Sequence, residues 1–427
     1  MAKTFFQKIT IKKILVFSAI SRLLLLPWTY HGDVIVTYWW GKFAKEFTWR
    51  GYYDWLNFGG YGRPDQPMLN IVYDWLIRLL YEFIYKIMWF INVNIPIFPS
   101  KIMSWYFFHG NQILLKLPML VADIFLIYFV YKFISKEFGF TKAKIAAIIL
   151  ALYPPLFHNS IIWGSGDSII NLFALLAVFT LYKKKYYSFI LLFLISVLYK
   201  SSLLIWCPVF LVIILKQRIK IKDILLMGGF ASILIYIVSR PFAIKNSFVW
   251  FYETMTQKIL PGAMPQITSN AMNFWAIIFG LKPRLDESLF LNIISFRSLS
   301  LIICVILYIY ILIKLYKNYS LKSILLSLVE ITLVTFVFMT RMHERYTFPA
   351  LIPLLILCFY DRRFIKYFVI LSITHYLNIY NWWFVPKIPV LISLLNLEIV
   401  IRSISVINLL LTIKLLTIKS ITGNAKK

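Results

Sequence analysis

The sequence predicts an all-α polytopic membrane protein with about twelve transmembrane helices and a long first extracytoplasmic loop that contains interfacial amphipathic helices. The 427 residues are 61% hydrophobic and have a mean hydropathy of +0.78. Apolar blocks of about 17–25 residues recur from end to end, which is the length that crosses a bilayer. Basic residues gather in the short links between these blocks. Residues 1–427 are therefore expected to form a single membrane domain.

The formal net charge of +28 indicates topology rather than a nucleic-acid partner. Links between spans that carry many lysines and arginines stay on the cytoplasmic side of a membrane. The three cysteines, Cys207, Cys304 and Cys358, all lie within apolar blocks. Neither a disulfide framework nor a structural zinc site is therefore expected.

The first two hydrophobic segments decide the topology. Lysines precede the first apolar block and no small-residue cleavage site follows it, so residues 14–30 are predicted to be an uncleaved span. In segment 67–91, four charges of alternating sign recur at i,i+4 spacing: Asp74, Arg78, Glu82 and Lys86. Each charge would cost about 2.5–3.5 kcal/mol near the centre of a bilayer. The segment is therefore predicted to be an interfacial helix with this charged stripe in water.

With segment 67–91 on the extracytoplasmic side, the later spans alternate in direction. Basic links such as Lys183–Lys185 then lie on the cytoplasmic side, and so do both termini. We expect the plasma (inner) membrane, cytoplasmic termini and an extracytoplasmic active site. The long outer loops are 31–113 and 240–289. The predicted spans after the first are 114–133, 145–162, 167–182, 186–199, 201–215, 224–239, 290–313, 323–340, 347–360, 366–382 and 390–412.

Several ionisable residues on the outer side or within spans have more than one interpretation. Asp33 either ends the first span as a solvated residue or faces a substrate. Asp167 is a candidate helix N-cap, which does not exclude substrate contact. Lys200 either marks the membrane surface by snorkelling or binds a ligand. Within the spans, Glu330 with Arg297 is a plausible structural pair.

The segment 341–346 is the most polar junction between two apolar blocks. It reads Arg-Met-His-Glu-Arg-Tyr and contains no glycine or proline spacer. Arg341 and Arg345 offer paired donors and His343 offers a further one, a composition suited to a phosphate. Glu344 would keep an arginine oriented. The alternative is an ion-paired hairpin tip.

Six groups of residues follow one another along the chain in a recognisable order: His31-Gly32-Asp33 with Tyr38-Trp39, Lys116-Leu117-Pro118 with Asp123, Trp163-Gly164 with Asp167, Lys200, the run 270–275, and Arg341 to Tyr346. On these residues the chain resembles, nearly end to end, the GT-C superfamily of polytopic glycosyltransferases, which use polyprenyl-phosphate sugars. It is most similar to dolichyl-phosphate-hexose-dependent mannosyl- and glucosyltransferases and their prokaryotic relatives. The chain departs from the family pattern at 61–67 and at Ser165, where a glutamine is common.

The resemblance implies an inverting transfer of a hexose, mannose or glucose, from a polyprenyl-phosphate donor to an acceptor hydroxyl. It implies Asp33 as the catalytic base. The acceptor would be a glycan, a glycolipid or a glycoprotein. Arg341, His343, Arg345 and Lys200 are the candidates for the departing phosphate. The candidates for sugar or acceptor binding are Asp167, Trp163, Tyr61, Asn273, Trp275 and Glu344.

No cofactor is expected. A catalytic metal ion is not expected either, because the cationic side chains can hold the leaving phosphate, although the carboxylates do not exclude one. Two other functions fit the same features. A lipid-linked glycan polymerase or ligase would share the spans, the long outer loop and the arginines. A non-enzymatic lipid-sugar flippase or transporter would show inverted repeats and broken spans in matching halves, and the sequence shows neither.

Overall fold

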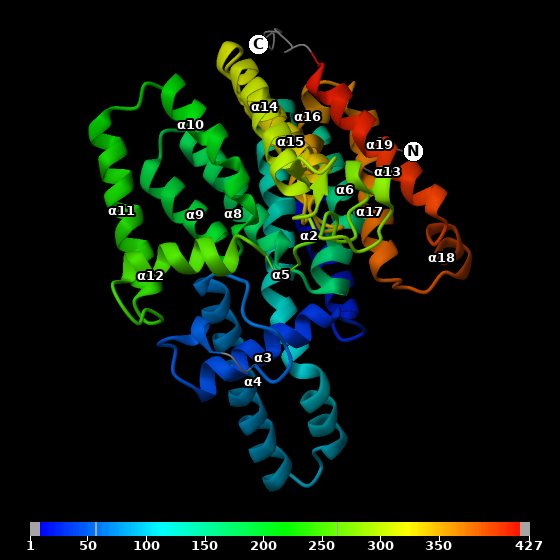
Figure 1. Cartoon of the computed structure of the whole chain (residues 1–427). Helices are drawn as coiled ribbons and strands as arrows, with labels where there is room; N and C mark the ends of the chain where they lie inside the picture. The colour runs from blue at the N-terminus through cyan, green and yellow to red at the C-terminus, as the bar shows by residue number, and fades with distance from the viewer. Residues whose placement is uncertain (1–8, 56–57, 263, 419–427) are drawn as a thin grey trace. The chain divides into compact units, whose positions relative to one another are not determined.

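The computed structural model describes residues 9–55, 58–262 and 264–418 (Figure 1). This part of the chain contains 18 α-helices and one antiparallel pair of two-residue strands. The chain forms two compact units. Unit 1 comprises residues 1–202 and 222–261, and unit 2 comprises residues 203–221 and 262–427.

Unit 1 is organised around a helix of 39 residues, α5, against which α2, α4, α6 and α8 pack. The first part of α5 pairs with α4 in a helical hairpin, and α3 packs on α4 (Figure 1). The elements of unit 1 are α2 (Ile11–Leu25), α3 (Gly32–Glu46), the 3-10 turn η1 (Tyr52–Asp54), α4 (Met68–Asn94), α5 (Ser100–Phe138), α6 (Phe140–Ala151), α7 (Pro154–Phe157), the π-helical turn η2 (His158–Trp163), α8 (Asp167–Tyr182), α9 (Tyr186–Tyr199), α11 (Ile221–Ser239), α12 (Ser247–Thr254) and the π-helical turn η4 (Met255–Ile259).

Unit 2 is centred on α15, whose side chains are almost all buried between α14, α16 and α19. The elements of unit 2 are the 3-10 turn η3 (Ser201–Trp206), α10 (Cys207–Lys216), α13 (Phe274–Phe279), β1 (Leu289–Phe290), β2 (Ile294–Ser295), α14 (Phe296–Lys317), α15 (Leu321–Phe338), α16 (Phe348–Tyr360), α17 (Phe364–Trp382), α18 (Pro389–Leu395) and α19 (Glu398–Leu416).

Five helices in the described ranges are long and apolar enough to cross a membrane: α5, α11, α14, α15 and α19. A sixth span results if α6 and the segment Pro154–Trp163, bent by 46° at their junction, are counted as one. Four further apolar helical segments have 10–17 residues. The all-helical character is therefore confirmed, with several helices that could cross a membrane. The count of twelve stays a prediction.

A buried ion pair joins α2 to α5 in unit 1. Arg22 Nε donates to Asp123 Oδ2 at 2.9 Å, and both side chains are at most 1% exposed. Ser160 Oγ donates to the same carboxylate oxygen at 2.6 Å, and Arg22 Nη1 also donates to the carbonyl of Ala151. One side chain thus connects α2, α5 and the end of α6.

We expect Asp123→Ala to destabilise the protein by about 3–5 kcal/mol, because it leaves a buried guanidinium without its counter-charge. The measurement is the thermal midpoint of the purified protein in lipid nanodiscs. The matched control is the double variant Arg22→Met with Asp123→Leu, which removes both charges and should stay close to the wild type. An unchanged midpoint in Asp123→Ala would contradict this account of the pair.

Two interpretations of charged residues are corrected by the structure. The buried Glu330 of α15 pairs with Lys314 of α14, so the suggested pair with Arg297 is wrong. Asp74 was expected on a charged stripe in water, but its side chain is buried against α3. A Cβ added at Gly41 of α3 would lie 2.5 Å from the Asp74 carbonyl oxygen. The close approach of the two helices at this glycine removes Asp74 from solvent, while Lys86 remains exposed.

Burial raises the pKa of Asp74 well above its ordinary value, and neither carboxylate oxygen has a hydrogen-bond partner among the described residues. The folded state therefore holds this proton more tightly than the unfolded state. This contribution to stability is fully present below the unfolded pKa and is lost as pH rises toward the folded pKa. At pH 8 we expect Asp74→Asn to raise the thermal midpoint by at least about 2 °C, the shift that roughly 1 kcal/mol gives.

At pH 4 the same variant should differ little from the wild type. Asp54→Asn is the control, because Asp54 lies in the turn η1 of the same unit but is 39% exposed and paired with Lys258. An Asp74→Asn midpoint equal to that of the wild type at both pH values would show that the carboxyl group carries no such penalty.

Candidate functional site

The candidate base, Asp33, lies in the first turn of α3 with its side chain 46% exposed. Trp163 Nε1, from the turn η2, donates to Asp33 Oδ2 at 3.0 Å. The His31 ring stacks on the Trp163 ring at a centroid distance of 4.1 Å. His31 Nδ1 accepts a hydrogen bond from the Asp33 backbone at 3.2 Å and so caps the helix. Two predicted site residues, 130 positions apart in the sequence, are thus in direct contact.

Gly164 and Lys116 allow this contact. Gly164 has φ +86°, and a Cβ there would lie 2.5 Å from a Val34 methyl group, so the turn after Trp163 approaches α3 closely only with glycine. Lys116 Nζ is buried and donates to the carbonyls of Leu26, Thr29 at 2.8 Å and Ile161 at 3.0 Å. The lysine therefore fixes the backbone on both sides of the Asp33–Trp163 contact.

The second contact between predicted site residues in unit 1 is an ion pair. Lys200 Nζ lies 2.5 Å from Asp167 Oδ1, and the two side chains are 12% and 7% exposed. Asn159 Nδ2 donates to the other Asp167 oxygen at 3.2 Å. Gly166 is the N-cap of α8, so Asp167 does not cap the helix. Lys200 faces this carboxylate, so the snorkelling interpretation does not describe it.

Asp65 is a carboxylate that sequence reasoning did not place among the site residues. It interacts electrostatically with both Lys200 and Asp33. Burial raises its pKa above the ordinary value, and the hydrogen bond from Gln66 at 2.9 Å and the charge of Lys200 oppose this only in part. The sequence signal for Asp65 was its position in the glycine- and proline-rich turn cluster formed by residues 59–67. Three carboxylates thus interact directly or electrostatically with Lys200 or with one another.

The predicted sugar contact Tyr61 lies in the same turn cluster. Its ring stacks on Trp39 of α3 at a centroid distance of 4.8 Å and an interplanar angle of 18°. Trp40, the next residue of α3, donates from its indole to the Gly62 carbonyl at 3.3 Å. The turn cluster is therefore held on the aromatic face of α3.

Arg341 of unit 2 already has a carboxylate partner in the structure. Its Nε and Nη2 lie 2.7 Å and 3.0 Å from the two oxygens of Asp286, and Thr340 Oγ1 donates to Asp286 at 2.9 Å. Burial acts to raise the pKa of Asp286, but the Arg341 and Thr340 hydrogen bonds hold it below the ordinary value. Sequence reasoning missed Asp286 because it lies 55 residues from Arg341.

Glu344 pairs with Arg345, as the sequence suggested when it assigned Glu344 to orienting an arginine. Arg345 Nη1 lies 2.7 Å from Glu344 Oε1, and the Glu344 side chain is only 1% exposed. Asn378 of α17 donates to the Glu344 carbonyl at 2.8 Å. His343 is 27% exposed, and its backbone bridges to Ser269 and Asn270. The segment 341–346 is therefore tied to the loop before α13, and both of its arginines are ion-paired.

Asn273 and Trp275, predicted to contact sugar, are buried inside unit 2. Asn273 caps α13 by accepting from the backbone of Trp275 at 3.1 Å and of Ala276 at 3.2 Å. Trp275 Nε1 donates to the Phe338 carbonyl at 2.8 Å. In this structure both side chains join α13 to α15, and contact with a sugar would require this packing to open.

The predicted site residues thus fall into two groups, one in each unit. Asp33, Tyr61, Trp163, Asp167 and Lys200 belong to unit 1, and the residues between 273 and 345 belong to unit 2. In the described parts of the chain, no group of three or more His, Cys, Asp or Glu side chains is arranged to hold a metal ion. The chain matches no protein-family model, and no curated protein matches its sequence.

Proposed function

We propose that the protein is an inverting glycosyltransferase that moves a hexose from a polyprenyl-phosphate donor to an acceptor hydroxyl on the extracytoplasmic side of the membrane. The observation that supports this most is the placement of Asp33. Its carboxylate is half-exposed, and Trp163 and His31 hold it at the start of α3. A general base must be both reachable by a substrate and fixed in direction.

In the proposed reaction, Asp33 takes the proton of the acceptor hydroxyl. The acceptor oxygen then bonds to the anomeric carbon, while the bond from that carbon to the phosphate oxygen breaks and the configuration inverts. Negative charge grows on the leaving polyprenyl phosphate, and cationic donors must stabilise it. Lys200, Arg341, His343 and Arg345 are proposed for that role, and Tyr61, Trp163, Asp167, Asn273, Trp275 and Glu344 for sugar and acceptor binding.

The transfer assay uses purified protein in nanodiscs, polyprenyl-phosphate mannose or glucose carrying a labelled hexose, and a mixture of glycan, glycolipid and glycopeptide acceptors. We expect label in an acceptor and release of unglycosylated polyprenyl phosphate. In proteoliposomes, transfer of donor between leaflets without any glycosidic product would support the flippase function instead.

The proposed topology places twelve spans in the plasma (inner) membrane, with the termini in the cytoplasm and 31–113 and 240–289 outside. In a variant without the three native cysteines, single cysteines at Lys184, Lys220 and Arg363 should not react with an impermeant thiol reagent in intact cells. Cysteines at the exposed positions Arg63 and Glu287 should react. Labelling of position 184 from outside would contradict the interfacial assignment of 67–91.

A further inference from the structure

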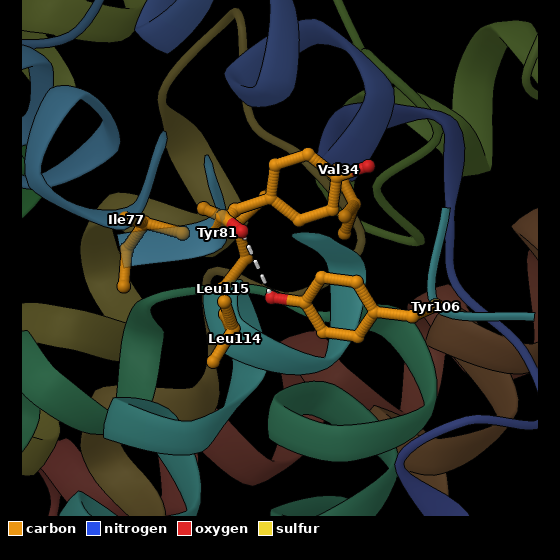
Figure 2. Close-up of a cluster of buried hydrophobic side chains, with 6 residues drawn as sticks. All are labelled: Val34, Ile77, Tyr81, Tyr106, Leu114 and Leu115. Carbon is orange, nitrogen blue, oxygen red and sulfur yellow. Dashed lines mark hydrogen bonds between the residues drawn. The ribbon is translucent and has the colours of Figure 1, made fainter. Parts of the chain in front are cut away.

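A groove in unit 1 lies between α3, α4 and α5, beside the first turn of α3. Its volume is ≈ 540 Å³, within the range of small-molecule sites. Its lining includes Tyr30, Val34 and Ile35, which lie within three positions of Asp33 in the sequence. Figure 2 shows a packed cluster in which the hydroxyl of Tyr106 donates to the Tyr81 carbonyl at 3.2 Å. Two members of this cluster, Val34 and Tyr81, also line the groove. Part of the groove lining is therefore held by packed side chains.

Two residues that line this groove each carry a buried hydrogen-bond donor that has no acceptor among the described residues. The two atoms are Arg78 Nη1 and Asn111 Nδ2. The Asn111 side chain belongs to a residue that is only 6% exposed and lines the groove. A buried donor without a partner costs about 1–3 kcal/mol. Both atoms therefore favour a ligand that accepts hydrogen bonds.

The position of Arg78 is fixed by its surroundings. Its guanidinium lies over the rings of Tyr38 and Tyr81, 5.1 Å and 5.2 Å from their centroids. Its Nε donates to Glu82 at 2.8 Å, and Lys45 pairs with the same carboxylate. Glu82 thus offsets the charge of Arg78 at the wall of the groove. The lining therefore favours a neutral ligand that accepts hydrogen bonds over an anion.

The lining has the chemistry of a saccharide site. Its walls combine tyrosine and tryptophan rings with side-chain amides from Asn111 and Gln112. A pyranose presents apolar C–H faces to such rings and hydroxyl groups to such amides. Aromatic rings that carry a polar tip, such as Tyr38 and Tyr85, can contact both parts of the sugar.

We propose that this groove binds a saccharide. Resting on the proposed transferase function, the saccharide is the non-reacting part of a glycan acceptor whose reacting hydroxyl extends toward Asp33. Arg78 Nη1 and Asn111 Nδ2 donate to its oxygens, and the aromatic walls contact its ring faces.

The test is saturation-transfer NMR on the full chain in phosphatidylcholine nanodiscs, because glycosidic detergents would compete. The probes are mannotriose, maltotriose and N-acetylchitotriose. We expect at least one to bind the wild type, and Asn111→Leu to weaken that binding about three- to tenfold through one lost hydrogen bond. Leucine has a similar shape and removes a donor that has no protein partner, so folding should not suffer. Asn94→Ala, exposed on the same hairpin, is the control and should bind as the wild type does.

Absence of binding for all three trisaccharides, or binding unchanged in Asn111→Leu, would overturn the proposal. So would displacement of a bound trisaccharide by millimolar inorganic phosphate, since that would identify an anion site. The transfer assay separates this failure from failure of the proposed function. Saccharide binding without any hexose transfer would support the proposed saccharide site and contradict the proposed transferase function. Hexose transfer with an unchanged KM for a glycan acceptor in Asn111→Leu would support the transferase function and contradict the saccharide site.

Discussion

Asp33→Asn is expected to lower hexose transfer by about 10²–10⁴-fold or more, because an amide cannot take the proton of the acceptor hydroxyl. Donor binding and folding should change little. The asparagine side chain has the same shape, and its carbonyl oxygen can still accept the hydrogen bond from Trp163 at the position of Asp33 Oδ2. The measurement is the initial rate of transfer from a polyprenyl-phosphate hexose, beside binding of the unglycosylated lipid phosphate.

The matched control is Glu46→Gln at the other end of α3. Glu46 is a carboxylate on the same helix, 44% exposed against 46% for Asp33, and it pairs with Lys42. Its loss should leave the rate unchanged. Near-normal turnover in Asp33→Asn would remove the base from this position, and Asp65 would become the next carboxylate to test because it interacts with both Asp33 and Lys200.

Arg345→Ala is expected to weaken binding of polyprenyl phosphate by about ten- to a hundredfold. A charge-assisted hydrogen bond is worth roughly 1.5–3 kcal/mol, which corresponds to that range. Arg345→Lys should recover only part of the affinity, because lysine keeps the charge but loses the paired donors. The measurement is direct binding of the lipid phosphate to the purified protein in nanodiscs.

The structure adds a necessary control to this experiment. Arg345→Ala leaves the Glu344 carboxylate, which is 1% exposed, without its partner at 2.7 Å, so a folding defect could imitate lost binding. The double variant Glu344→Gln with Arg345→Ala removes the buried carboxylate together with its arginine and should still bind weakly. Arg363→Ala, an ion-paired and exposed arginine, should bind normally. Unchanged binding in Arg341→Ala, His343→Ala and Arg345→Ala alike would contradict the phosphate role.

The helical fold could be predicted because long apolar blocks have few other solutions in a membrane. The position of Asp33 after the first apolar block and the neighbouring pair Glu344–Arg345 were also predictable from the sequence, whereas the helix that holds Asp33 in its first turn was not predicted. In both cases the relevant residues are close in the chain or mark the end of an apolar block. The local sequence pattern is therefore sufficient to predict these two positions.

The remaining contacts depend on which helices pack together, and sequence periodicity does not encode this. Lys314, not Arg297, meets Glu330 because α14 runs alongside α15 and brings its last turn to that carboxylate. Asp286 reaches Arg341 from a loop 55 residues away. The burial of Asp74 depends on a glycine in another helix. A charge at helical spacing identifies a stripe, but only tertiary packing decides whether that stripe meets water.

The indole that holds Asp33 makes its two carboxylate oxygens unequal. An indole N–H can only donate, so Trp163 requires an acceptor at Oδ2 and disfavours a proton on that oxygen. The other oxygen, Oδ1, lies 3.2 Å from His31 Nδ1. In the proposed reaction, the proton of the acceptor hydroxyl is therefore expected on Oδ1, so the acceptor has to approach Asp33 from the side of that oxygen.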